Sequence, residues 1–313
     1  MDSLLSTNEV ADRLGVDIKT VRRYIHAGKL KASRIGRDYR ILSSSLNSLL
    51  REPEQARATR SALITAIVNQ KGGVGKTTST FNLGVALSRL GRRVLLVDLD
   101  PQAALSTSAG IPVAHLSMSI YQALLDDSVD PKAIITRTSS GVDVLPATID
   151  LAAAEVELIN TTLRELVLKD VLAKLIDQYD HILIDCPPSL GLLTVNALAA
   201  AHQVIIPLQC EFLATRGLTL LLRTLSKIQA RLNRELKIAG ILPTMYDGRT
   251  THASEVLAEL RSSFPGQVYD VVIKHSVLLK ESPAAALSIL DYDSSHEAAQ
   301  AYMQLAEEVD RGE

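Results

Sequence analysis

The 313-residue chain has no tryptophan, and its aromatic residues make up only 4% of the sequence. We therefore expect a core built from aliphatic side chains. There are two cysteines, Cys186 and Cys210, and no recognisable signal peptide, so a disulfide framework is disfavoured and a reducing cytoplasm is favoured. No apolar run approaches the ~18 residues of a membrane helix. The seven histidines lack the spacing of a zinc site.

Charge is distributed unevenly along the chain. Residues 1–60 carry 12 basic and 7 acidic residues, whereas residues 61–313 carry 21 and 28. A basic segment of net charge +5 beside an acidic body of net charge −7 favours nucleic acid as the partner of the first segment. A solvated basic surface is the alternative. We predict a small domain at 1–51, a linker at 52–61 and a large domain at 62–313.

Residues 6–30 have the pattern of two short helices joined by a turn at Gly15. Ser6 or Thr7 is expected to begin the first helix, and Asp17 the second. In a helix-turn-helix, the second helix lies in the major groove of DNA. The side chains expected to contact DNA from this helix are Lys19, Thr20, Arg22 and Arg23.

Residues 29–42 then predict a two-stranded wing that turns at 36–38, and residues 43–52 predict a third helix. Arg34 and Arg37 of the wing are expected to contact the phosphate backbone. The segment resembles the small winged helix-turn-helix of the MerR and excisionase type. A three-helix interaction domain is the alternative.

The rest of the chain alternates short apolar runs with helical patterns, which is typical of an α/β fold. The pattern predicts a parallel sheet covered by helices on both faces, with ligands at the carboxyl ends of its strands. The candidate strands are 63–70, 92–100, 142–147, 181–186, 203–209, 237–245 and 267–273.

The stretch NQKGGVGKTT, residues 69–78, directly follows the first of these strands. It fits the second half of the phosphate-binding loop Gly-x4-Gly-Lys-Ser/Thr, with Gln70 in place of the first glycine. Its backbone amides would hold phosphate oxygens, Lys76 would neutralise the terminal phosphates, and Thr77 would bind Mg²⁺. The residues predicted to bind nucleotide are Lys71, Gly72, Gly73, Val74, Gly75, Lys76, Thr77 and Thr78.

A second lysine, Lys71, stands in the same loop. With it, KGGVGKTT resembles the deviant Walker A motif of the ParA/MinD family of ATPases. VDLDPQ (97–102) and LIDCPPSLG (183–191) resemble the acidic motifs of that family, and the similarity extends over roughly residues 62–311. The resemblance implies ATP and Mg²⁺ as cofactors. It also implies that Lys71 reaches the nucleotide of a partner subunit.

The acidic motifs supply the remaining expected site residues. By resemblance, Asp100 positions the attacking water, Asp98 lies near the metal, and Asp185 holds Mg²⁺ through water. Asp98 and Asp100 are two positions apart, so on a strand their side chains would lie on the same side. We thus expect Lys71, Lys76 and Asp100 to be catalytic, and Thr77, Asp98 and Asp185 to surround the metal.

Three branches of the family fit poorly. The cysteines do not form the pair of the iron–sulfur branch, no guanine motif is found, and residues 294–313 are acidic rather than a basic membrane helix. The ParA partition branch remains. It implies an ATP-dependent homodimer, non-specific DNA binding with an operator as a further target of the first domain, a ParB-like partner, no membrane binding and a nucleoid-associated cytoplasmic location. A nucleotide-responsive transcription regulator and a positioner of protein cargo are the alternatives.

Short partition ATPases bind DNA through basic residues late in the chain. Arg249 matches the first of these positions, whereas Leu278 occupies the second, so we expect Lys274 and Lys280 to substitute. Four further basic residues recur on a long predicted helix, where they could contact DNA or could equally form a solvated face. These are Arg223, Lys227, Arg231 and Arg234.

Overall fold

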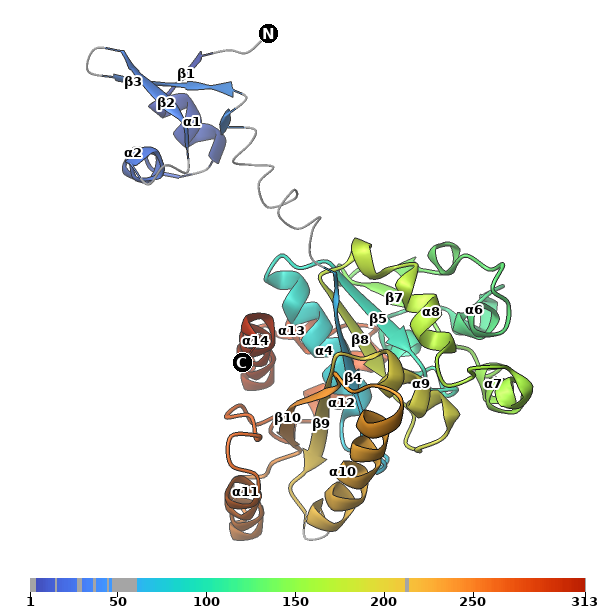
Figure 1. The fold of residues 1–313 in the computed structure, drawn as a ribbon. Helices are drawn as coiled ribbons and strands as arrows, with labels where there is room; N and C mark the ends of the chain where they lie inside the picture. The colour runs from blue at the N-terminus through green and yellow to red at the C-terminus, as the bar shows by residue number, and fades with distance from the viewer. Residues whose placement is uncertain are drawn as a thin grey trace. The chain divides into compact units, whose positions relative to one another are not determined.

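The computed structural model describes residues 4–14, 16–26, 30–35, 38–43, 45–46, 61–211 and 214–312. The chain divides into two compact units, Met1–Arg60 and Ser61–Glu313 (Figure 1). Nearly all of the predicted linker lies outside the described residues, so its boundaries remain a prediction.

Two helices and a three-stranded antiparallel sheet can be described in the first unit. Its elements are β1 (Leu4–Ser6), α1 (Thr7–Leu14), α2 (Ile18–His26), β2 (Ala32–Ile35) and β3 (Asp38–Leu42), and the strand order is β1-β3-β2. The wing prediction is confirmed, but β1 was not foreseen. Residues 43, 45 and 46 are helical, and the rest of the predicted third helix lies outside the described residues.

Both predicted helix starts in this unit are confirmed. The Ser6 hydroxyl accepts a hydrogen bond from the Glu9 N–H (3.3 Å), and the Glu9 carboxylate accepts one from the Ser6 N–H (2.8 Å), which forms a capping box. The Asp17 carboxylate accepts a hydrogen bond from the Thr20 N–H at 2.7 Å. The helices pack on the sheet through a small aliphatic core that includes Val10, Val21 and Ile41.

The second unit is built on a seven-stranded sheet with the order β10-β9-β4-β8-β5-β7-β6. The strands are β4 (Leu63–Ile67), β5 (Val94–Asp98), β6 (Thr136–Arg137), β7 (Asp143–Leu145), β8 (His181–Asp185), β9 (Gln203–Gln209) and β10 (Lys237–Thr244). Neighbouring strands are parallel except β6, which is antiparallel to β7. The predicted α/β fold is confirmed, with one short antiparallel strand at the edge.

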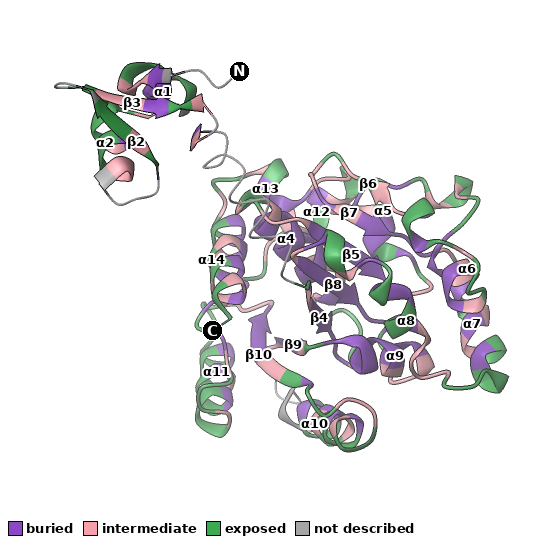
Figure 2. Cartoon of the chain, turned by 45° about the horizontal axis from the view of Figure 1, so that its top comes forward, coloured by how far each residue is buried: buried purple, intermediate pink, exposed green. Residues whose placement is uncertain are grey.

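Helices cover both faces of this sheet (Figures 1 and 2). One face carries α4 (Lys76–Arg89), α5 (Ala104–Ser108), α13 (Ile289–Tyr292) and α14 (Glu297–Arg311), and α12 (Leu278–Ala284) contacts α5 and α13. The other carries α6 (Ile120–Leu125), α7 (Leu151–Glu157), α8 (Val167–Ala173), α9 (Leu192–Ala200), α10 (Ala214–Arg231) and α11 (Thr251–Ser263). The strands supply both cores by alternation: Leu95 packs into one and Leu96 into the other. Both cores are mainly aliphatic, as expected.

The prediction of a strand at 267–273 is wrong. This segment runs beside β10 and is joined to it by the isolated bridge Ile241–Val268, whereas a second bridge, Tyr246–Lys274, lies beyond the ends of both. Its alternating pattern has another cause, because Tyr269, Val271 and Ile273 are buried in the core on the α14 face. Within the described part of the chain, no helix combines the length and the apolar character needed to cross a membrane.

Candidate nucleotide site

The phosphate loop connects β4 to the first residue of α4. Gly73 and Gly75 have φ angles of +75° and +86°, a region that side chains with a Cβ rarely adopt. The loop therefore needs glycine at these two positions. It delivers the chain to the amino terminus of a 14-residue helix, whose unpaired N–H groups and dipole favour an anion.

The two lysines of the loop lie in opposite environments. Lys76 is buried, and its Nζ donates a hydrogen bond to the backbone oxygen of Lys71 at 3.2 Å. Burial lowers the pKa of Lys76, and the charge of Asp185 opposes that shift. The Lys71 side chain is 54% exposed, and its Nζ lies 2.6 Å from Glu211 Oε2 and 3.1 Å from Gln209 Oε1. One lysine is thus inside the loop, and the other is on its outer surface.

Asp185 ends β8 and is completely buried beside the loop. Its two oxygens accept hydrogen bonds from the hydroxyls of Thr77, at 2.7 Å, and Thr80, at 3.3 Å. Burial raises the pKa of Asp185 to about 8, and the nearby Asp98 carboxyl adds to the rise. A cation at this position would stabilise the ionised carboxylate.

Asp98 ends β5, whereas Asp100 lies beyond the strand. The expectation that both side chains lie on one side of a strand is therefore wrong, because the chain leaves the sheet at Asp98. The buried Asp98 carboxylate accepts hydrogen bonds from the N–H (2.8 Å) and hydroxyl (2.7 Å) of Ser106 and from the N–H of Asp100 (3.2 Å). Burial raises its pKa to about 6. Asp98 thus anchors the loop that carries the partly exposed Asp100.

Sequence reasoning missed several residues that support these groups. Thr80 has a local signal, because it lies one helical turn after Lys76. Glu211 and Thr244 have none, since they reach the loop from distant parts of the chain. The Thr244 hydroxyl, at the end of β10, donates a hydrogen bond to the Val74 carbonyl oxygen at 2.8 Å.

A cavity of about 60 Å³ adjoins the loop at Gly75 and Thr78. Lys274 and Lys280, which were expected to contact DNA, both line it, and Lys274 Nζ forms an ion pair with Glu297 at 2.7 Å. The structure therefore places these two lysines beside the phosphate loop. Their role in DNA binding stays a prediction.

The other predicted DNA contacts are distributed over both units. Lys19, Arg22, Arg23 and Arg34 are exposed, Thr20 is half-buried, and Arg37 lies outside the described residues. Arg249 is 89% exposed but makes a two-pronged ion pair with Asp247, with both N–O distances at 2.8 Å.

The donor set fits a magnesium–nucleotide complex. The loop offers backbone amides and a buried lysine, and the buried Gln70 Nε2 has no partner among the described residues. The described residues contain no cluster of three or more histidine, cysteine, aspartate or glutamate side chains able to hold a metal. Mg²⁺ suits this arrangement, because in nucleotide sites it uses one or two carboxylates together with phosphates and water.

Comparison with known proteins identifies the family. A family profile described as an AAA domain matches residues 62–238, and a helix-turn-helix domain profile matches residues 4–53. The sporulation initiation inhibitor protein Soj of Bacillus subtilis is 47% identical over 246 residues, which cover 79% of this chain and 97% of that protein. This chain belongs to the ParA/MinD family of ATPases.

Two further proteins are similar to this chain over most of its length. The chromosome-partitioning ATPase Soj of Treponema pallidum is 46% identical, covering 77% of this chain and 94% of its own length. A structure titled cobyrinic acid a,c-diamide synthase from Mycobacterium smegmatis, with a bound ATP analog and magnesium, has a TM-score of 0.70 at 44% identity and covers 79% and 93% of the two chains. The predicted family, fold and N-terminal helix-turn-helix are confirmed, whereas the roles of individual residues stay predictions.

Proposed function

We propose that this ATPase is a partition protein, which segregates plasmid or chromosomal DNA. ATP and Mg²⁺ close two copies into a dimer, the dimer binds DNA without sequence preference, and hydrolysis stimulated by a ParB-like protein releases it. The chromosome-partitioning name of the Treponema relative supports the cellular role. The helix-turn-helix match supports an additional contact with DNA, such as an operator.

The position of Lys71 is the observation that carries the proposal. A lysine needed only for its own nucleotide would lie inside the loop, as Lys76 does. The Lys71 ammonium instead lies on the surface, where its contacts with Glu211 and Gln209 are easily exchanged because all three groups border water. It is therefore available to the nucleotide of a second subunit. Such a contact couples dimerisation to nucleotide occupancy.

The remaining residues take roles that their contacts support. The loop amides would hold the phosphate oxygens, and Lys76 would neutralise their charge. Thr77 and Asp185 would hold Mg²⁺, which would supply further charge stabilisation during phosphoryl transfer. Asp98 fixes the loop of Asp100, whose partly exposed carboxylate can orient a water molecule.

DNA binding has two candidate surfaces. In the first unit, the exposed cations lie on α2 and in the wing, the parts that dock in proteins of this type. In the second unit, Arg223, Lys227 and Arg231 are four residues apart on the exposed face of α10 and have no ion pair or hydrogen bond with any described residue. Phosphate contacts of this kind bind without sequence preference.

The test is sedimentation of the Lys71→Ala protein with ATP and Mg²⁺. The variant should still bind ATP through Lys76 but should stay monomeric, because the partner's phosphates lose a cation across a desolvated interface. Lys169→Ala, which removes an exposed lysine on α8, serves as the control and should dimerise normally. A Lys71→Ala protein that dimerises as well as the parent would falsify the cross-subunit role.

The helix-turn-helix match also favours a second candidate function, transcription regulation with the nucleotide as a ligand. The two functions differ in their need for turnover. A regulator would retain operator repression in the Asp100→Ala variant, whereas partition requires repeated hydrolysis. Measuring plasmid retention and promoter activity with the same variant separates them.

A further inference from the structure

The exposed lysine of the phosphate loop is held by residues at the end of β9. Lys71 Nζ lies 2.6 Å from Glu211 Oε2 and 3.1 Å from Gln209 Oε1. The side-chain amide of Gln209 donates a hydrogen bond to the other carboxylate oxygen of Glu211, and the Glu211 N–H donates one to the Gln209 carbonyl oxygen at 2.8 Å. The neighbours of the carboxylate thus fix it in the position where it meets the lysine.

The backbone of Lys71 is attached to the same strand. The Asn69 side chain accepts a hydrogen bond from the Lys71 N–H at 3.0 Å and donates one to the Pro207 carbonyl oxygen of β9 at 2.7 Å. Asn69 is 6% exposed, so this bridge between loop and strand is shielded from water. Because the backbone is already fixed beside β9, Lys71 needs to order only its side chain to reach Glu211.

The contact between the two side chains is nevertheless open to exchange. The Lys71 and Glu211 side chains are 54% and 53% exposed. Ion pairs with this exposure are weak, because water screens the charges and both long side chains lose freedom. Lys71 can therefore leave Glu211 for an anion of higher charge, such as the terminal phosphates of a nucleotide. Glu211 does not accompany it, since a carboxylate and a phosphate repel each other.

We propose that Glu211 is an intramolecular competitor for Lys71, which holds the lysine on its own subunit until the nucleotide of a second subunit replaces the carboxylate. This inference rests on the proposed cross-subunit role of Lys71. Dimerisation breaks two such contacts, because each subunit gives up its own. The two carboxylates also oppose the approach of the partner's phosphates, since like charges repel. Glu211 therefore raises the protein concentration at which the ATP dimer forms.

The size of the effect follows from the strength of one exposed ion pair. Such a pair changes an equilibrium by about two- to fivefold. One pair is lost in each subunit, so the two factors multiply in the dissociation constant of the dimer. Glu211→Gln removes the charge and keeps the shape and an oxygen acceptor, so it should lower that dissociation constant by about 4- to 25-fold.

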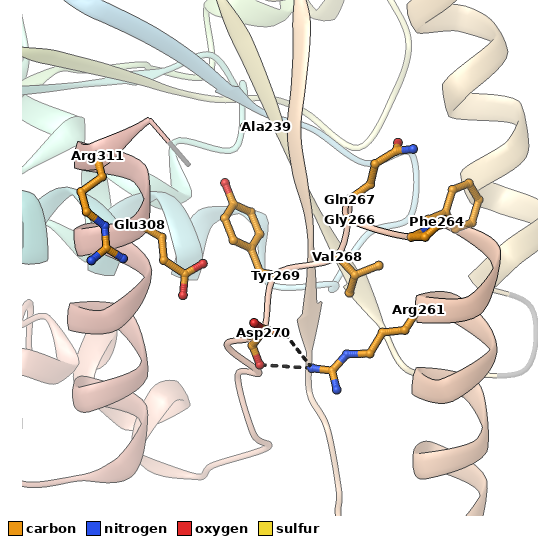
Figure 3. A pocket seen from close by; sticks show the side chains of 11 residues that line it. Ala239, Arg261, Phe264, Gly266, Gln267, Val268, Tyr269, Asp270, Glu308 and Arg311 are labelled. Atoms are coloured by element: carbon orange, nitrogen blue, oxygen red, sulfur yellow. Dashed lines mark hydrogen bonds and ion pairs between the residues drawn. The ribbon is translucent and has the colours of Figure 1, made fainter.

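The test is sedimentation of full-length Glu211→Gln over a series of protein concentrations, with saturating ATP and Mg²⁺. The matched control is Asp270→Asn, which removes the exposed carboxylate of another ion pair, 3.9 Å from Arg261. This pair lies in a cavity of about 660 Å³ between α11 and α14 (Figure 3), which shares no lining residue with the cavity at the phosphate loop. The control should dimerise as the parent does. A Glu211→Gln dissociation constant that is unchanged or higher overturns the proposal.

A second measurement, without nucleotide, tests the contact itself. After a brief pulse of acetic anhydride, mass spectrometry should show Lys71 acetylated at least twofold faster in Glu211→Gln than in the parent, because the ammonium has lost its carboxylate. Asp270→Asn should leave that rate unchanged. Equal Lys71 rates in Glu211→Gln and parent contradict the proposal.

The Lys71→Ala protein separates this inference from its premise. If Lys71→Ala stays monomeric while Glu211→Gln dimerises as the parent does, the cross-subunit role holds and only the competition by Glu211 is wrong. If Lys71→Ala dimerises as the parent does, the cross-subunit role fails and the competition fails with it.

Discussion

The buried Lys76 ammonium donates a hydrogen bond to the backbone oxygen of Lys71 at 3.2 Å, while the Lys71 side chain extends outward to Glu211. One loop thus carries an internal and an external cation. The left-handed glycines Gly73 and Gly75 between them let the chain turn within a few residues. Because of this separation, we expect different effects from replacing each of the two lysines.

Replacing Lys76 with alanine should abolish nucleotide binding. The side chain is the only buried cation that the described part of the loop offers to the phosphates, and Lys71 points away from it. Titration calorimetry with ATP and Mg²⁺ measures the effect, and Lys169→Ala again provides an exposed-lysine control. ATP affinity within about twofold of the parent would contradict the assigned role.

Asp100→Ala should bind ATP and dimerise but hydrolyse at least about 100-fold more slowly, a typical loss for a group that positions or activates the nucleophile. Asp100 lies outside the buried hydrogen bonds of Asp98 with Ser106, so the fold should persist. Phosphate release in the presence of DNA and the stimulating partner is the measurement. Parental turnover would remove Asp100 from the water-positioning role.

Replacing Arg22 and Arg23 together with glutamine should lower the salt dependence of duplex binding. Each lost phosphate contact reduces the slope of log K against log salt by about 0.9, so two contacts amount to about 1.8. Binding is measured without ATP, where the first unit should dominate. The double change Lys227→Gln/Arg231→Gln on α10 removes the same charge. If it lowers the slope while the α2 change does not, the body carries this binding.

Stability should fall as pH drops below 6.5, because of His181. Burial lowers the pKa of His181 from 6.5, despite the Asp310 carboxylate 3.1 Å from Nε2. The unfolded chain therefore binds the proton first, and between 6.5 and the lowered folded pKa each drop in pH favours unfolding. Above pH 6.5 the contribution is fully present. Each unit of lowering corresponds to about 1.4 kcal/mol.

Urea unfolding at pH 7.5 and 5.5 checks this prediction. His181→Gln keeps a donor for Asp310 but cannot be protonated, so it should lose part of the difference between the two midpoints. Arg92 also binds Asp310 through two hydrogen bonds, of 2.7 and 2.6 Å, and remains charged throughout this range. An identical midpoint difference in parent and variant would show that His181 is not responsible.

The sequence was most informative where the signal is local. The Ser6 and Asp17 helix starts, the wing and the phosphate loop each depend on residues a few positions apart, and all lie where expected. The prediction was wrong where one sequence pattern fits two different structures. The alternation at 267–273 arises from burial against one core and not from a strand ladder.

The acidic motifs show the same limit within the site. Spacing alone could not reveal that β5 ends at Asp98, which separates the buried Asp98 from the partly exposed Asp100. Lys274 and Lys280 are exposed, as expected, but the sequence did not show that they also line the cavity beside the loop. In each case the deciding contacts come from other segments.

By itself, the amino-acid sequence determined the phosphate-binding loop, because its glycines, Lys76 and Thr77 lie within one ten-residue stretch that directly follows a strand. Only the tertiary structure decided how distant groups complete the site. Asp185 reaches Thr77 across 108 positions, and Glu211 meets Lys71 across 140, because parallel strands bring their carboxyl ends to one edge.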